Sequence, residues 1–171
     1  MDDLACPLAD VEIFFNTFYL DQRGYLGPIY STRDAKRHIE LEELRISHSK
    51  ENVLRGFHGD FEINKVLTIL QGRAKLALID IRPYSSTFKQ VWSADLDASK
   101  TVYIPCGILN AHYCYSDVFL FYGWDAPYNG PDNQITVRWD SAGVEWPDGD
   151  KILSDRDKNA KSLEEYLKES P

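Results

Sequence analysis

The sequence has few cysteines, and this shortage limits the kinds of structural site that the protein can contain. Only three of the 171 residues are cysteine, namely Cys6, Cys106 and Cys114, and no two form a CxxC pair. Disulfide frameworks and zinc-thiolate sites need more sulfur atoms at closer spacing, so we expect neither. Unpaired cysteines are typical of a reducing compartment, which predicts a cytoplasmic protein.

Basic residues and long apolar runs are also scarce. The chain has 19 Lys and Arg against 27 Asp and Glu, which gives a formal charge of -8. Nucleic acids and anionic membranes are bound through basic surfaces, so we expect neither as a partner. No apolar run approaches the length of a membrane span, and Met1-Asp2-Asp3 lacks the positive charge that opens a signal peptide. A small anionic ligand remains compatible with this charge, since a few arginines can form a local basic pocket.

What the chain does contain is a series of short apolar and aromatic segments separated by turn residues. Its length suits one domain over residues 1–171. A strand, a turn at 21–24 and a second strand are expected within residues 11–30. Further strands are expected at 65–70, 74–81, 88–96, 101–104, 112–122 and 135–139. Many short strands with regular breaks predict an all-β sandwich or barrel.

Two segments favour helix instead. Residues 32–44 are rich in charges and helix formers. Residues 162–169 open with Ser162 and carry Glu165 three positions later, which is the capping-box pattern. We therefore expect a few short helices on the β domain, including a C-terminal one.

The stretch at 52–60 (NVLRGFHGD) carries the first candidate chemistry. Arg55 and His58 stand three positions apart in a short apolar segment, and Lys65 follows in the next expected strand. Histidine changes charge most readily near neutral pH, so His58 is a candidate general base with cations beside it. The alternative is a buried, hydrogen-bonded histidine in a sheet.

Residues 105–112 resemble the second motif of a cupin barrel, in which a histidine helps to bind a metal. The position of that histidine is occupied here by Asn110, and Asp60 replaces a second histidine of the first cupin motif. Metal ligation needs three or four convergent ligands, so we predict a cupin-type barrel without a metal. Carbanion chemistry would then need a protein base and a cation or hydrogen bond to stabilise the enolate.

An ordered set of motifs resembles the family of dTDP-4-dehydrorhamnose 3,5-epimerases and relatives that act on other nucleotide-linked 4-keto sugars. The matching pieces span about residues 18–160. They are DQRGY at 21–25, NVLRGFHGD at 52–60, IDIRP at 79–83, STF at 86–88, IPCG at 104–107, RWD at 138–140, VEWP at 144–147 and LSDRD at 153–157. The resemblance implies a homodimeric cupin-type jelly roll that needs no metal and no organic cofactor.

The resemblance also implies residue roles. His58 would remove the proton α to the C4 ketone of a nucleoside-diphosphate sugar, with Asp157 as the carboxylate that orients it. Lys65 would lie near the keto oxygen and favour the enolate. Arg55 would contact the sugar or phosphate. Arg23 would reach the diphosphate, often from the second subunit, since a guanidinium binds phosphate oxygens bidentately.

Several positions depart from the family pattern. The family's catalytic tyrosine falls on Gly123. Its neighbour Tyr122 is our candidate acid, which requires a bulge or a one-residue gap because strand side chains alternate faces. The family's histidine after Pro-x-Gly is Asn110, with His112 two positions on, and we take both as candidate substrate-binding residues. Leu76 replaces an acidic residue of the family.

These departures fit a branch that acts on a different nucleotide sugar. Pieces such as NAHY at 110–113 resemble relatives that handle GDP-linked 4-keto-6-deoxy-heptoses for capsule synthesis. The predicted function is inversion of C3, C5 or both in a nucleoside-diphosphate 4-keto-6-deoxy sugar, for surface polysaccharide. Two alternatives stay open. One is a nucleotide-sugar 3,4-ketoisomerase, which uses the same enolisation, and the other is a non-catalytic cupin that binds nucleotide sugars.

Overall fold

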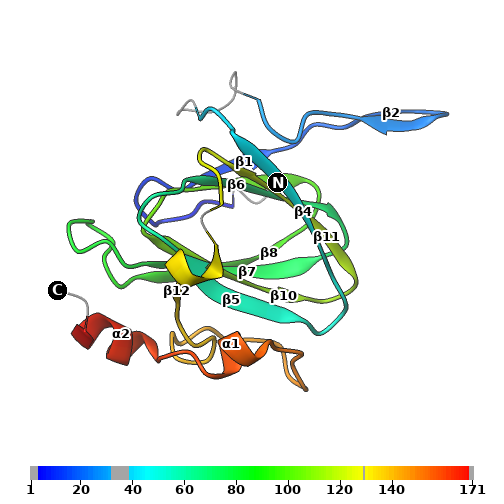
Figure 1. The fold of residues 1–171 in the computed structure, drawn as a ribbon. Helices are drawn as coiled ribbons and strands as arrows, with labels where there is room; N and C mark the ends of the chain where they lie inside the picture. Colours follow the sequence, from blue (N-terminus) through cyan, green and yellow to red (C-terminus); the bar gives the residue numbers. More distant parts are fainter. Residues whose placement is uncertain (1–3, 32–38, 129, 170–171) are drawn as a thin grey trace.

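Two antiparallel five-stranded sheets face each other in the computed structural model, which describes residues 4–31, 39–128 and 130–169 (Figure 1). The first sheet has the order β1-β9-β6-β11-β4 and the second β12-β5-β10-β7-β8. The all-β jelly-roll sandwich predicted from the sequence is confirmed.

The elements of the two sheets and the helices have the following bounds. The first sheet contains β1 (Glu12–Phe15), β9 (Lys100–Ile104), β6 (Lys65–Gln71), β11 (Val118–Trp124) and β4 (Glu43–Ser49). The second contains β12 (Ile135–Thr136), β5 (Leu54–Gly59), β10 (Ile108–Cys114), β7 (Ala74–Asp80) and β8 (Val91–Leu96). The helices are η1 (Pro131–Asn133), α1 (Asp155–Lys158) and α2 (Leu163–Glu169).

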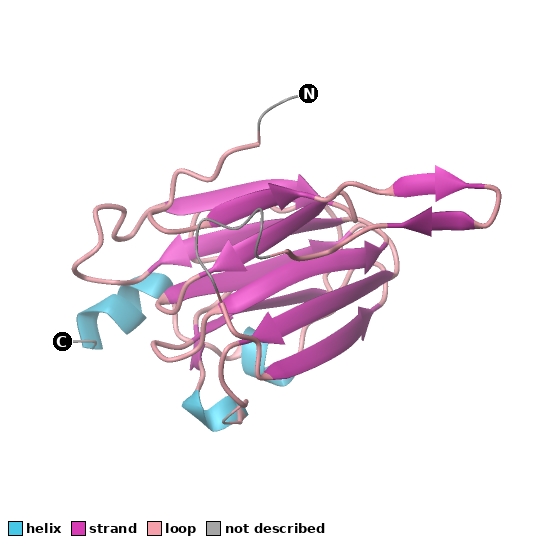
Figure 2. Cartoon of the chain, turned by 90° about the horizontal axis from the view of Figure 1, so that it is seen from above, coloured by secondary structure: helices cyan, strands magenta, loops and turns pink. Residues whose placement is uncertain are grey.

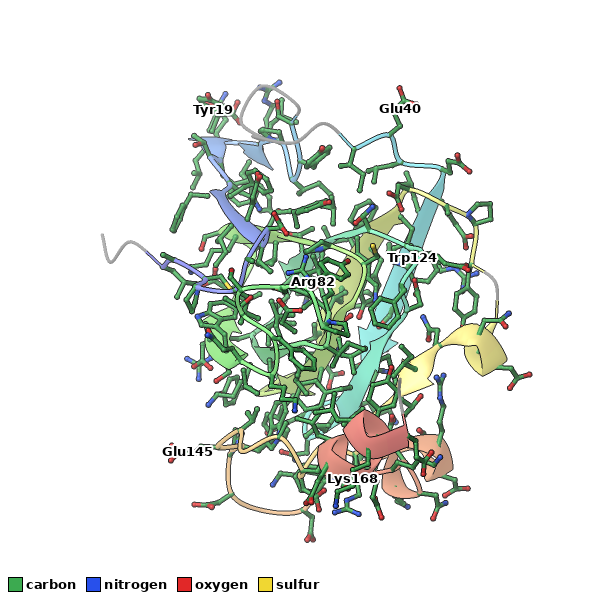
Figure 3. The ribbon with its side chains drawn as sticks, turned by 90° about the vertical axis from the view of Figure 1, so that its left-hand side faces the viewer. Tyr19, Glu40, Arg82, Trp124, Glu145 and Lys168 are labelled. Carbon is green, nitrogen blue, oxygen red and sulfur yellow. The ribbon has the colours of Figure 1, made fainter. Side chains whose placement is uncertain are left out.

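A separate hairpin of β2 (Tyr19–Asp21) and β3 (Gly24–Leu26) projects from the sandwich, as Figure 2 shows from above. This is the predicted strand–turn–strand unit. Figure 3 shows the side chains of the two sheets packed between Tyr19 of this hairpin and Lys168 of α2.

The main core lies between the two sheets. Leu67 of β6 and Leu76 and Leu78 of β7 point into it, in line with the alternation of side chains along a strand. A second cluster covers the outer face of the second sheet, where Phe57 packs near Trp146 with ring centroids 6.2 Å apart. Figure 1 shows α1 and α2 on this side. Because both faces are covered, β7 reads as a nearly continuous apolar run.

The motif IDIRP at 79–83 is a buried tie between the sheet and the N-terminal segment. Arg82 pairs with Asp80 at 2.7 Å, and the two side chains are 5% and 0% exposed. The same guanidinium binds Asp10 at 2.9 Å and donates to the Ala9 carbonyl at 2.8 Å. This part of the motif therefore serves the fold, because it lies apart from the cavity described below.

The prediction of one strand over 112–122 is wrong. The segment contains the end of β10 and most of β11, which belong to different sheets. Residues 115–117 form the connection, and Ser116 and Asp117 are its polar turn residues. Aromatic and apolar residues on both sides of this short turn make the two strands read as one.

The helix prediction over 32–44 fails where it can be compared with the structure. Residues 32–38, with His38, lie outside the described residues. Residues 39–42 are loop, and Glu43 and Leu44 begin β4. Pairing of this edge strand with β11 overrides the helix propensity of its charged residues.

The C-terminal helix is confirmed together with its cap. The Ser162 hydroxyl accepts from the backbone N–H of Glu165 at 3.2 Å, and the Glu165 carboxylate accepts from the backbone N–H of Ser162 at 2.8 Å. These are the two reciprocal bonds of a capping box. Among the described residues, no helix combines the length and apolar character that crossing a membrane requires.

Candidate functional site

A cavity of about 240 Å³ opens between the two sheets and gathers most of the predicted site residues. Five of them line it: Arg55, His58, Lys65, Asn110 and Tyr122. Arg55, His58 and Asn110 come from β5 and β10 of the second sheet, and Lys65 and Tyr122 come from β6 and β11 of the first. A hollow of about 420 Å³ along β1 is larger, but its lining contains no histidine and no charged side chain. The smaller cavity is therefore the candidate active site.

One wall of the cavity carries a histidine–carboxylate pair. Nε2 of His58 lies 2.6 Å from Oδ1 of Asp157, and the two side chains are 25% and 3% exposed. Burial raises the pKa of Asp157, but hydrogen bonds from His58, Ser154 and the Gly56 backbone outweigh burial and leave this pKa below its ordinary value. The carboxylate is therefore ionised at neutral pH and accepts a hydrogen bond from the Nε2–H group of His58. In the neutral imidazole, Nδ1 is then free to act as a base.

Local structure brings Asp157 to a histidine 99 positions away in the chain. The segment before α1 pairs with the start of β5 through the N–H of Leu54 and the carbonyl of Ile152, at 3.0 Å. Ser154 then caps α1, and its hydroxyl donates to Oδ2 of Asp157 at 2.7 Å. The cap thus starts the helix and also holds the carboxylate in place.

The opposite wall carries a cation and a phenol. Nζ of Lys65 donates to Oδ1 of Asn110 at 3.1 Å. Burial lowers the pKa of Lys65 to about 8, against the opposing effect of the Asp60 charge. Burial raises the pKa of Tyr122 to about 12, while the Arg55 charge and a hydrogen bond from Asn110 act the other way. Tyr122 therefore keeps its proton at neutral pH and has one to donate.

Tyr122, and not Gly123, is the residue of β11 that faces the cavity. Tyr122 lines it, whereas a side chain at Gly123 would point the other way, since a Cβ there would lie 2.8 Å from Leu41. The pairing of β11 with β6 shifts register between Phe119 and Leu120. The extra residue is Leu70 of β6, so β11 keeps its regular alternation from Val118 to Trp124, and this irregularity does not decide the face of Tyr122.

Two predicted substrate-binding residues do not line the cavity. His112 lies on β10 two residues after Asn110, and its side chain is buried. Arg23 lies at the turn of the projecting hairpin with its side chain 84% exposed, paired to Asp21. One copy of the chain therefore does not bring Arg23 to His58.

His112 is a buried imidazole without a hydrogen bond. Neither ring nitrogen has a partner in the part of the chain that the structure describes. Burial lowers the pKa of His112 to about 3, and the positive charges of Arg55 and His58 lower it further, against Asp157. The ring is therefore neutral at pH 7.

Sequence reasoning missed an aromatic and cationic cluster at the cavity. The Arg45 guanidinium lies 5.0 Å from the Trp124 ring centroid and 4.4 Å from that of Tyr128, and all three residues line the cavity. Glu43 binds Nε of Arg45 and accepts from the backbone N–H of Tyr128 at 2.6 Å. The expected helix ends at residue 44, and Arg45 opens the part of the chain expected to form strands. Strand alternation places Arg45 and Ser47 on one face, which was not recognised as part of the site.

The described residues contain no cluster of metal ligands. Within residues 4–31, 39–128 and 130–169, no three His, Cys, Asp or Glu side chains converge as a metal site would require. Asn110, at the position of a cupin ligand, instead binds Lys65.

The sequence and the fold both match those of known proteins. Residues 5–165 match the model of the dTDP-4-dehydrorhamnose 3,5-epimerase family. The chain belongs to this family. A dTDP-4-dehydrorhamnose 3,5-epimerase of Mycolicibacterium smegmatis is 35% identical over 142 residues, which cover 78% of this chain and 70% of that protein. The enzyme of the same name from Salmonella typhimurium is 27% identical, covering 84% and 85%.

A solved structure agrees with the sequence matches. The dTDP-4-dehydrorhamnose 3,5-epimerase of Elizabethkingia anophelis superposes with a TM-score of 0.83 at 27% identity, covering 95% of this chain and 96% of that one. The resemblance read from the motifs is confirmed. The chain is an isomerase of the nucleotide-sugar epimerase type.

The buried His112 predicts how stability depends on pH. Its folded pKa, about 3, lies below the unfolded value of 6.5, so its neutral burial contributes fully above pH 6.5 and is lost as the pH falls. Between pH 7 and 5 this loss is about 2 kcal/mol. In urea unfolding, we expect His112→Leu to lose about 2 kcal/mol less than the wild type over this range. The exposed His48→Leu serves as control, and a His112→Leu protein with the wild-type pH dependence would contradict the assignment.

Proposed function

We propose that the protein inverts C3, C5 or both in a nucleoside-diphosphate 4-keto-6-deoxy sugar. The observation that carries this proposal is the His58–Asp157 pair at 2.6 Å, with Lys65 and Tyr122 on the other wall of the same cavity. Inversion needs a base on one face of a carbon and a proton donor on the other. The family supports the substrate class, since its members are named for a dTDP-linked 4-dehydro sugar.

The proposed reaction proceeds through an enolate. Nδ1 of His58 removes the proton from the carbon beside the C4 ketone, and the C–H electrons form a C=C bond while the carbonyl electrons move onto oxygen. Asp157 steadies the resulting imidazolium, and the Lys65 ammonium stabilises the enolate oxygen. Tyr122 then delivers its proton to the opposite face as the ketone re-forms. Solvent returns a proton to Tyr122 and takes one from His58.

The two alternatives fit this arrangement less well. A 3,4-ketoisomerase needs the same enolisation, but it does not need a proton donor on the opposite wall. A non-catalytic cupin needs neither a buried carboxylate behind His58 nor a lysine whose pKa is lowered to about 8. Tyr122 opposite the histidine favours inversion over both.

A second copy of the chain would complete the site. The hairpin around Arg23 carries four large apolar side chains that are 67–79% exposed: Tyr19, Leu20, Tyr25 and Leu26. Exposed apolar groups at this density mark a contact surface. In the proposed homodimer, the hairpin docks on the second copy and Arg23 binds the diphosphate of the substrate held there.

The role of His58 is tested with His58→Asn. We expect incorporation of solvent deuterium at C3 and C5, followed by NMR, to fall by about 10²–10⁴-fold, because the base is lost. His48→Asn is the matched control, since His48 is 44% exposed and outside the cavity. Substrates are dTDP- and GDP-linked 4-keto-6-deoxy sugars. Near-normal exchange in His58→Asn would refute the base. In the wild type, a product with its ketone at C3 would identify a ketoisomerase. A complete lack of deuterium exchange would identify a binding protein.

The role of Lys65 is tested by pH. Its pKa, lowered to about 8, means that the cation is present below pH 8 and is lost above it. If the cation stabilises the enolate, kcat/KM falls as the pH rises through about 8. In Lys65→Arg the guanidinium stays charged, so this limb should move to higher pH. An alkaline limb that is unchanged in Lys65→Arg would assign it to another group.

The role of Arg23 is tested by complementation. Losing a charged hydrogen bond costs about 1.5–3 kcal/mol, so Arg23→Ala should raise KM by about 10–100-fold. Co-expression of Arg23→Ala with the inactive His58→Asn should restore sites with a wild-type KM, because His58 and Arg23 of one site then come from different copies. A monomer in sedimentation, or no restored sites, would contradict the shared site.

A further inference from the structure

Asn110 connects the two walls of the cavity. It lies on β10 with a buried side chain, and its register partner on β5 is His58. Lys65 and Tyr122 come from neighbouring strands of the facing sheet. The amide of Asn110 therefore reaches from the strand pair that holds the base to the residues proposed to stabilise and protonate the enolate.

The chemistry of Lys65 determines which way the amide of Asn110 points. An ammonium group only donates hydrogen bonds, and an amide accepts only through its oxygen. Nζ of Lys65 lies 3.1 Å from Oδ1 of Asn110, so a flipped amide would set two donors against each other. The NH₂ group is therefore on the side away from Lys65.

Asn110 and Tyr122 line the same cavity, and the NH₂ group of Asn110 is the end of the amide that is turned away from Lys65. The hydrogen bond from Asn110 acts to lower the pKa of Tyr122, which is the effect of a donor on a phenol oxygen. The Tyr122 oxygen thus accepts from Asn110, and its own proton must point elsewhere. Tyr122 lines the cavity, so the cavity is where a substrate carbon can receive that proton.

We propose that Asn110 is a positioning residue, whose amide turns the Tyr122 proton into the cavity and holds Lys65 beside the enolate oxygen. This inference rests on the proposed epimerase function and deepens it. When the proton moves from the Tyr122 oxygen to carbon, the phenolate that remains still accepts from the Asn110 NH₂ group. The same bond therefore orients the acid before transfer and stabilises its anion afterwards.

A carboxylate at position 110 would reverse this arrangement. The side chain in Asn110→Asp has nearly the same shape but only accepts, so it would take hydrogen bonds from both Lys65 and Tyr122. The Tyr122 proton would then be held on the carboxylate and away from the substrate. In Asn110→Leu the phenol would be neither oriented nor trapped.

The test compares two rates on the same 4-keto-6-deoxy nucleotide sugar in heavy water. Exchange with retention needs only His58, whereas inversion also needs Tyr122. We expect the ratio of inversion to exchange to fall by about 100-fold in Asn110→Asp and by about 10-fold in Asn110→Leu. A structural role predicts the opposite order, because Asp preserves the side-chain shape. A wild-type ratio in Asn110→Asp, or a lower ratio in Asn110→Leu than in Asn110→Asp, would overturn the proposal.

A double variant shows whether Asn110 acts through Tyr122. If it does, Asn110→Asp should change the inversion-to-exchange ratio less than 3-fold in a Tyr122→Phe background. A further loss of about 100-fold in that background would show that Asn110 acts on the substrate directly and would overturn the proposal. If the wild type exchanges no deuterium, the proposed function itself fails. This outcome is distinct from failure of the proposal for Asn110, in which the wild type does exchange deuterium.

Discussion

The hydrogen bond between His58 and Asp157 is the interaction on which the rest of the site depends. A buried carboxylate is costly unless its oxygens are bonded, and here His58, the Ser154 hydroxyl and the Gly56 backbone bond them. These partners keep Asp157 ionised, and the ionised carboxylate sets the tautomer of His58. In the proposed mechanism, Lys65 and Tyr122 can act only because the opposite wall holds His58 as a base in a defined orientation.

The sandwich architecture places the two walls. Each sheet directs alternate side chains inward, so β4, β6 and β11 of the first sheet and β5 and β10 of the second surround a small cavity with groups of complementary chemistry. Asn110 joins the walls through Lys65 at 3.1 Å. In the proposed mechanism, this polar bridge holds the acid and the cation in place.

Much of the fold and of the candidate site could be predicted from the sequence, because local patterns carry them. Turn residues between apolar segments marked most strands, and the motif around His58 marked the proposed base. What failed depended on pairing between distant segments. The break between β10 and β11, the strand character of Glu43 and Leu44 and the depth of His112 follow from partners far along the chain. The face of Tyr122 follows from the regular pairing of β11 with β4.

The tautomer of His58 tests the central claim most directly. ¹⁵N NMR of the histidine rings, with His58 assigned by comparison with His58→Asn, reports which nitrogen carries the proton. We expect neutral His58 to be protonated at Nε2, with Nδ1 bare, and this preference to be lost in Asp157→Ala. A proton on Nδ1, or the same tautomer in Asp157→Ala, would contradict a base that is oriented by the buried carboxylate.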